Sequence, residues 1–148
     1  MEIIHEVTAH LENKPGRLAK ICSALAQEKV DIRAITVMEA DGPSVLRLIA
    51  SDLEGARKTL TSLGVEHSVG EVLAVQLENR TGSLARVLER LAEDHINIDY
   101  AYASTASVGN KALGIFHTNN TKRALQVLAE ATPPGADKSA GRRPLHSR

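Results

Sequence analysis

Alternating apolar and polar positions open the chain. Every odd-numbered position from 3 to 11 is apolar except residue 5, whereas the even-numbered positions include Glu6, Thr8 and His10. A period of two predicts a β-strand with one buried face. The odd positions are therefore expected to face a core.

A helical pattern follows this strand. Its apolar residues recur with the spacing of one helix face, at Leu18, Ile21, Cys22, Leu25 and Ala26. This spacing predicts an amphipathic helix with a single apolar stripe, on which Cys22 is a small core residue. Pro15 suits the first turn of that helix, where its missing N–H is not needed.

Two strands and a second helix come next. Residues 30–38 are rich in β-formers, Asp41-Gly42-Pro43 has the composition of a turn, and residues 44–50 predict the third strand. Ser51 or Asp52 can cap a helix that carries apolar residues at 53, 56, 60 and 63, and Gly64 fits just past its end. Residues 65–69 predict a short fourth strand.

The resulting order is β-α-β-β-α-β. Each helix has one apolar stripe, so both helices must cover the same face of a four-stranded antiparallel sheet. The pattern predicts an α+β protein with a ferredoxin-like fold.

The same pattern then begins again, which marks an internal repeat. Leu73, Val75 and Leu77 repeat the alternation, and Ile96-Asn97-Ile98 repeats Val30-Asp31-Ile32. Residues 84–92 repeat the helix stripe, Val108-Gly109-Asn110 is a turn candidate, and residues 111–117 predict a strand. Asn119 or Asn120 can start the last helix. Tyr100 and Tyr102 share one strand face, where we expect them to serve packing or an interface.

The two copies differ at their ends. After Ala131 the chain is rich in Pro, Gly and charge and has no apolar period, which predicts a disordered tail over residues 132–148. We therefore predict two domains, residues 1–70 and 71–131, with the second lacking its own last strand. An unpaired sheet edge is a template for pairing, so either the other repeat or a second copy of the chain should close it.

Composition narrows the functional classes. Eighteen basic and 18 acidic residues give a net charge of +0, so we expect binding neither to nucleic acid nor to a membrane. The chain has one cysteine, its first residues lack the features of a signal peptide, and no apolar run approaches the roughly 18 residues of a membrane span. We expect a cytoplasmic protein.

The most informative stretch is the turn before each first helix. Residues 11–19 read Leu-Glu-Asn-Lys-Pro-Gly-Arg-Leu-Ala, and residues 77–85 read Leu-Glu-Asn-Arg-Thr-Gly-Ser-Leu-Ala. Followed by Val30-Asp31-Ile32 and Ile96-Asn97-Ile98, these turns closely resemble the ACT domain, a regulatory module that binds amino acids. The chain as a whole resembles a small tandem ACT domain protein from Met1 to about Ala131, with Thr81 in place of the expected proline.

The resemblance implies ferredoxin-like domains that pair edge to edge, with a ligand at the domain interface near the first turn. A helix start offers free N–H groups to a carboxylate, and glycine lets a ligand approach the backbone. An Asn side chain can both donate and accept hydrogen bonds. Asp31 can accept a charge-assisted hydrogen bond from the ammonium group of a ligand, whereas Asn97 can orient that group without an opposite charge. The candidate ligand-binding residues are Asn13, Lys14, Pro15, Gly16, Arg17, Leu18, Asp31, Asn79, Gly82, Ser83, Leu84 and Asn97.

These residues also have a structural explanation. Gly16 and Gly82 could be present solely because a tight turn needs glycine. Asn13 and Asn79 could simply form hydrogen bonds within their own turns, and Asp31 could be a solvent-exposed residue at the start of a strand. The histidines show no metal-ligand spacing, and no phosphate loop or catalytic constellation is evident. We therefore predict a regulatory protein that is not an enzyme, needs no cofactor, binds a free amino acid and forms a homodimer.

The alternative is a regulatory subunit of a biosynthetic enzyme. The first repeat resembles the ACT domain of the small subunit of acetolactate synthase. The second half of that subunit is of a different kind, so the close repetition of the loop at Asn79 argues against this alternative.

Overall fold

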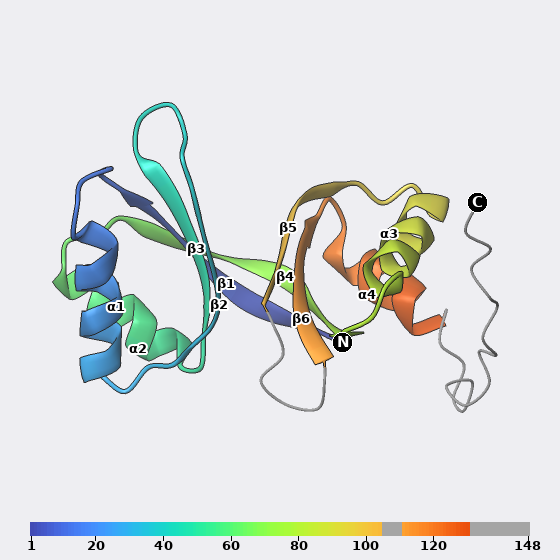
Figure 1. Cartoon of the computed structure of the whole chain (residues 1–148), viewed down its shortest axis with the longest axis horizontal. Helices are drawn as coiled ribbons and strands as arrows, with labels where there is room; N and C mark the ends of the chain where they lie inside the picture. The colour runs from blue at the N-terminus through green and yellow to red at the C-terminus, as the bar shows by residue number, and fades with distance from the viewer. Residues whose placement is uncertain (105–110, 131–148) are drawn as a thin grey trace.

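Two long strands, β1 (Glu2–Leu11) and β4 (His67–Glu78), lie side by side at the centre of the computed structural model, which describes residues 1–104 and 111–130. Antiparallel pairing joins all six strands into one sheet in the order β2-β3-β1-β4-β6-β5 (Figure 1). The remaining elements are α1 (Arg17–Gln27), β2 (Ile32–Met38), β3 (Ser44–Ala50), α2 (Leu53–Ser62), α3 (Ser83–Glu93), β5 (Ile98–Ser104), β6 (Lys111–Thr118) and α4 (Thr121–Glu130).

Each long strand serves both repeats. The start of β4 pairs with the end of β1, as in Ala9 opposite His67, and completes the strand order β2-β3-β1-β4 of the first repeat. The start of β1 pairs with the later part of β4, as in Glu2 opposite Ala74, and takes the place of a fourth strand in the second repeat. Two ferredoxin-like halves are therefore confirmed, and within one chain the first repeat covers the edge that the second leaves open.

One detail of the strand prediction was wrong. Residues 65–69 and 73–77 were expected to form two strands, but a single strand runs from His67 to Glu78. Gly70 continues the ladder opposite Glu6 and does not break it. The predicted domain boundary at residue 70 falls inside this strand, while the predicted turn at 108–110 and the tail at 132–148 lie outside the described residues.

The helices form two separate layers at the two ends of the molecule (Figure 1). α1 and α2 pack on the first half around Ile21, Leu25 and Leu60, and α3 and α4 pack on the second half around Leu91 and Val127. Asp52 caps α2 through a 3.0 Å bond from the Gly55 N–H, as predicted. Asn120 accepts from the Arg123 N–H at the start of α4.

The predicted helix stripes are only partly buried. Ile21 and Leu25 are inside, but Cys22 is half-buried, and Leu18 is 38% exposed. Leu84, at the matching position of α3, is 47% exposed. The first turn of each helix therefore leaves one leucine partly exposed to solvent.

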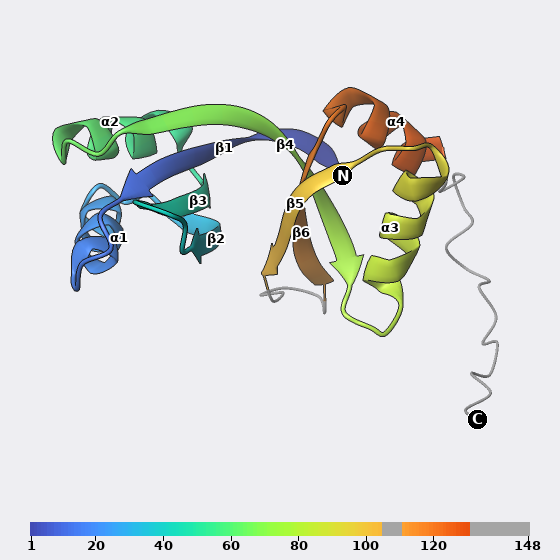
Figure 2. The same ribbon diagram turned by 90° about the horizontal axis from the view of Figure 1, so that it is seen from above.

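The opposite face of the sheet is also buried. The sheet bends so that β2 and β3 face β5 and β6 (Figure 2), and residues of β2 approach residues of β5 across the bend. An apolar cluster fills this inner face, made of Ala34, Ile49, Val72, Ala74 and Ile115. The inner face was missed because alternation along one strand cannot show that a distant strand covers its polar side.

A buried carboxylate lies on this inner face. Glu6, expected on the polar side of β1, is 2% exposed and accepts hydrogen bonds from Tyr100 and Tyr102, the latter at 2.7 Å. Arg47 Nε lies 3.9 Å from Glu6, and its guanidinium lies 3.9 Å from the centre of the Tyr100 ring. The His117 ring stacks on Tyr100 with a centroid separation of 4.8 Å. We call Glu6, Arg47, Tyr100, Tyr102 and His117 the Glu6 cluster.

We expect both tyrosines to resist ionisation in the folded protein. Burial, and then the hydrogen bond to Glu6, raises the pKa of Tyr100 to about 12 and raises the pKa of Tyr102 as well. The chain has two tyrosines and no tryptophan, so ultraviolet absorbance of phenolate reports these two groups alone. Absorbance should stay flat as the pH passes 10, the ordinary tyrosine value, and rise only near 12 or on unfolding.

The raised pKa values of the two tyrosines make the stability of the fold depend on pH. Because the folded pKa exceeds the unfolded one, the stabilising effect is complete below pH 10 and is lost as the pH rises from 10 toward 12. Two tyrosines that titrate near pH 10 in protein with native circular dichroism would contradict the buried cluster.

The shared strands also predict that the second half cannot fold alone. Residues 71–148, produced without β1, should be unfolded or self-associated, because the β4 edge and the inner face lose their partner. Circular dichroism measures whether the fragment is folded, and light scattering measures whether it self-associates. Adding residues 1–70 should restore a folded one-to-one complex, whereas a monomeric, folded 71–148 fragment would show that the predicted domains are independent.

Candidate functional site

The two repeated turns have the same backbone structure. In the first, Lys14 N–H donates to Glu12 O (2.9 Å) and Arg17 N–H to Lys14 O (3.3 Å). In the second, Arg80 N–H donates to Glu78 O (2.8 Å) and Ser83 N–H to Arg80 O (3.3 Å). Thr81 therefore replaces Pro15 without changing the turn.

Glycine is required at the end of each turn for a backbone reason. Gly16 has φ +84° and Gly82 has φ +91°, in the left-handed region that other residues adopt only with strain. A Cβ at either position would meet no atom within 4 Å. Both helix starts are therefore open to solvent on this side.

Each helix start leaves backbone donors unused. Neither Gly16 nor Gly82 offers a capping side chain, and among the described residues the N–H groups of Leu18, Ala19, Leu84 and Ala85 have no hydrogen-bond partner. The helix dipole adds a partial positive charge at the same place. Both turns can accept an anionic group, such as a carboxylate.

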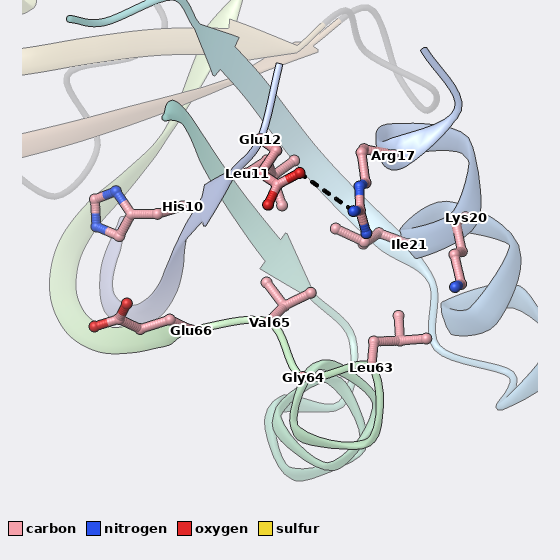
Figure 3. Close-up of a pocket in the computed structure, with 10 residues that line it drawn as sticks. All are labelled: His10, Leu11, Glu12, Arg17, Lys20, Ile21, Leu63, Gly64, Val65 and Glu66. Atoms are coloured by element: carbon pink, nitrogen blue, oxygen red, sulfur yellow. Dashed lines mark hydrogen bonds and ion pairs between the residues drawn. The ribbon is translucent and has the colours of Figure 1, made fainter. Parts of the chain in front are cut away.

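A pocket of about 200 Å³ lies beside the first turn (Figure 3). Arg17, Lys20 and Ile21 reach it from α1, and the chain from Leu63 to Val65 forms its base. The complete lining is His10, Leu11, Glu12, Arg17, Lys20, Ile21, Leu63, Gly64, Val65 and Glu66. The volume is below the roughly 300–1,000 Å³ of drug-sized ligand pockets, so it suits a small metabolite.

The charges around this pocket are mixed. Glu12 Oε2 lies 3.0 Å from Lys14 Nζ and 3.3 Å from Arg17 Nη2. The hydrogen bond and charge of Lys14, and the charge of Arg17, lower the pKa of Glu12, which therefore stays ionised at neutral pH. Lys20 makes no ion pair with any residue in the described part of the chain. Cations, carboxylates and apolar side chains at one opening suit a small zwitterion with an apolar portion.

The predicted ligand residues do not all meet in one chain. Asn13, Lys14, Pro15, Gly16, Arg17 and Leu18 lie in or next to the first turn and are exposed, and Arg17 lines the pocket. Asp31 comes just before β2, at the other end of α1, where its N–H donates to Ser51 Oγ (3.0 Å). Asn97 lies at the equivalent position before β5, where its N–H donates a hydrogen bond to Asn119 Oδ1 (3.2 Å).

Several pocket residues were not predicted. Leu63 to Glu66 follow α2 and lie far from the first turn in sequence, and only strand pairing brings them there, through the bond from His10 N–H to Glu66 O (3.2 Å). His10 and Glu12 were visible as polar residues at the end of β1. Nothing in the sequence marked Lys20 apart from other exposed helix residues.

The second turn differs from the first in its surroundings. Asn79, Gly82 and Leu84 are exposed, as in the first turn, but Ser83 replaces Arg17 and Arg86 replaces Lys20. The segment equivalent to Leu63–Glu66 would follow Glu130, outside the described residues. The two turns lie at opposite ends of the β1–β4 ladder, and β4 alone extends for roughly 40 Å, so the two turns are well separated within one chain.

We expect the glycine at each turn to be needed for its conformation. Gly16→Ala and Gly82→Ala should each lower the free energy of unfolding by about 1–2 kcal/mol, the cost of an L-residue in the left-handed region. Asn at either position should cost less, because Asn tolerates this region. Urea denaturation measures these differences.

Gly70→Ala is the matched control. Gly70 has no positive φ and an added Cβ would also meet nothing within 4 Å, so this change should be nearly neutral. Equal losses at all three glycines would contradict the explanation by backbone conformation.

No helix within residues 1–104 and 111–130 has both the length and the apolar character to cross a membrane. The same residues contain no cluster of three His, Cys, Asp or Glu side chains suited to a metal ion.

Comparison with solved structures identifies several proteins of similar fold. Protein BT0572 from Bacteroides thetaiotaomicron is 29% identical over 87% of this chain and 88% of its own, with a TM-score of 0.80. The ligand-free regulatory subunit of aspartate kinase from Thermus thermophilus is 15% identical, with 90% and 99% covered and a TM-score of 0.62. The regulatory subunit of aspartate kinase from Thermus flavus is 18% identical, with 88% and 94% covered and a TM-score of 0.56. A comparison with curated proteins finds no match.

The sequence itself matches a family model over nearly its whole length. The matched residues are 2–132, and the model describes an ACT domain pair. This span contains both repeated turns and all four helices. The chain belongs to the ACT domain pair family.

Proposed function

We propose that this chain is a regulatory protein that senses a free amino acid and catalyses no reaction. The observation that carries the proposal is the duplicated turn, which presents an open glycine and two unused N–H groups at the start of a helix. Membership of the ACT domain pair family supports a regulatory role. We place the protein in the cytoplasm, where free amino acids are available.

The first turn offers complementary groups for each part of an amino acid. The N–H groups of Leu18 and Ala19, with Arg17 nearby, suit a carboxylate. Glu12 and Glu66 at the pocket suit an ammonium group. Leu18, which is 38% exposed beside the turn, can cover an apolar side chain.

The second turn would form a weaker or different site. It keeps Asn79, Gly82 and Leu84 but has Ser83 where the first has Arg17, so it lacks one cation. Likewise, the second repeat has the neutral Asn97 at the position where the first repeat has the charged Asp31. Two sites of unequal affinity follow from these substitutions.

A homodimer is part of the proposal. Asp31 lies at the far end of α1 from the turn of its own repeat, so it can face a ligand only across an interface. A second copy of the chain can bring Asp31 or Asn97 against a turn. Ligand would then favour one arrangement of copies because it binds that arrangement more tightly.

A regulatory subunit of a biosynthetic enzyme is the second candidate. The chain has the fold of aspartate kinase regulatory subunits over nearly their full length, and likeness at this identity concerns the fold alone. Affinity purification of the chain from its native cells decides between the two, because a stoichiometric catalytic subunit would favour the second candidate.

Isothermal titration calorimetry against the twenty amino acids tests the proposal. We expect heat of binding with at least one of them and a loss of about 10-fold to 150-fold in affinity for Arg17→Ala, from the roughly 1.5–3 kcal/mol of a hydrogen bond to a charged group. Arg57→Ala is the matched control, since among residues 1–104 and 111–130 Arg57 pairs with Glu54 alone, on the exposed face of α2. Folded protein that gives no heat with any amino acid would refute the sensing role.

A further inference from the structure

The inner face of the sheet contains the same set of five positions twice, once fully polar and once mostly apolar. Strand pairing in the two halves follows one register, so each residue of the Glu6 cluster has an equivalent in the other repeat. The equivalent pairs are Glu6 and Val72, Arg47 and Ile115, Tyr100 and Ala34, Tyr102 and Thr36, and His117 and Ile49.

Four of these equivalents form the apolar cluster of the inner face, namely Val72, Ile115, Ala34 and Ile49. The fold is therefore satisfied by apolar side chains at these positions. A buried carboxylate at Glu6 is not needed for packing, and buried ionic groups often give no more stability than apolar residues of similar size.

The polar set links the two halves of the sheet. Glu6 lies on the shared strand β1, next to the stretch that pairs with β3, and Arg47 lies on β3 of the first half. Both hydrogen-bond donors to Glu6, Tyr100 and Tyr102, lie on β5 of the second half. If the halves moved apart, Glu6 would lose both donors, and a buried carboxylate without donors is unfavourable. Separation of the halves would therefore exchange these two bonds for bonds to water.

The cluster also reaches a candidate ligand residue. His117, which stacks on Tyr100, binds Asp99 Oδ2 through Nδ1 at 2.9 Å. Asp99 Oδ1 in turn accepts from Asn97 Nδ2 at 3.1 Å. An unbroken set of contacts therefore runs from Asn97 through Asp99, His117 and Tyr100 to Glu6.

We propose that the Glu6 cluster is a latch that sets the angle between the two halves, and that its release lets the two turns change their relative position. Its connection to ligand through Asn97 rests on the proposed function, whereas the latch itself does not. Contact between β2 and β5 closes the bend when the latch is formed.

Distance measurement between the helices tests the latch without ligand. Spin labels at Ser23→Cys on α1 and Glu89→Cys on α3, both exposed and equivalent in the two repeats, would be placed in a Cys22→Ser background. Labelled chains are diluted with unlabelled protein so that only distances within one chain are read. Pulsed electron resonance should give one narrow distance distribution for the otherwise unchanged protein.

Removal of the donors should alter that distribution. Tyr100→Phe/Tyr102→Phe keeps the rings but removes both hydroxyl groups, and we expect a shifted or second distance population. Glu6→Gln, which keeps an acceptor but removes the charge, should shift the population less. A folded double Phe variant with an unchanged distribution would overturn the latch.

Leu60→Ala is the control for general loosening. Leu60 is fully buried in the helix-side core of the first half and does not contact the inner face, so its truncation should lower stability while the distance distribution stays unchanged. An equal shift in this variant would show that any destabilisation opens the bend, which would also overturn the proposal.

Discussion

The antiparallel pairing of β1 with β4 is the constraint on which the rest of the structure depends. Each strand is long enough to border both helix layers, so neither repeat has a complete sheet without the other. The pairing places the two turns at opposite ends of the molecule and brings Glu66 beside His10. The bend of the same sheet brings β2 near β5 (Figure 2), and Glu6 is buried on the inner face.

Local patterns predicted most of the elements. Apolar spacing located all four helices and most strands, and Gly16, Gly82, Asp52 and Asn120 act at helix starts as their chemistry suggests. These predictions succeeded because they depend on residues close together in sequence. The repeat itself gave the fold, since the same order of elements occurs twice.

Long-range features could not be predicted in the same way. The alternation of β1 assigned Glu6 to a polar face, because a single strand does not show that Tyr100 and Tyr102 will cover it. The base of the pocket comes from Leu63–Glu66, which meets the first turn only through strand pairing. The exposure of Leu18 likewise depends on which distant segments cover it, and the helical period does not contain that information.

The sharing of strands has a consequence for how the chain reaches its native state. Glu2 pairs with Ala74, so the start of β1 must wait for a partner 72 residues later (74 minus 2). Closing so long a loop has an entropic cost that grows slowly with its length, but non-local contacts of this kind slow folding. During synthesis the first half of β1 is an unpaired edge, and its apolar residues are then exposed to other chains. The start of β1 is therefore among the last segments to gain its strand partner. Until then it is the segment most exposed to wrong pairing with other chains.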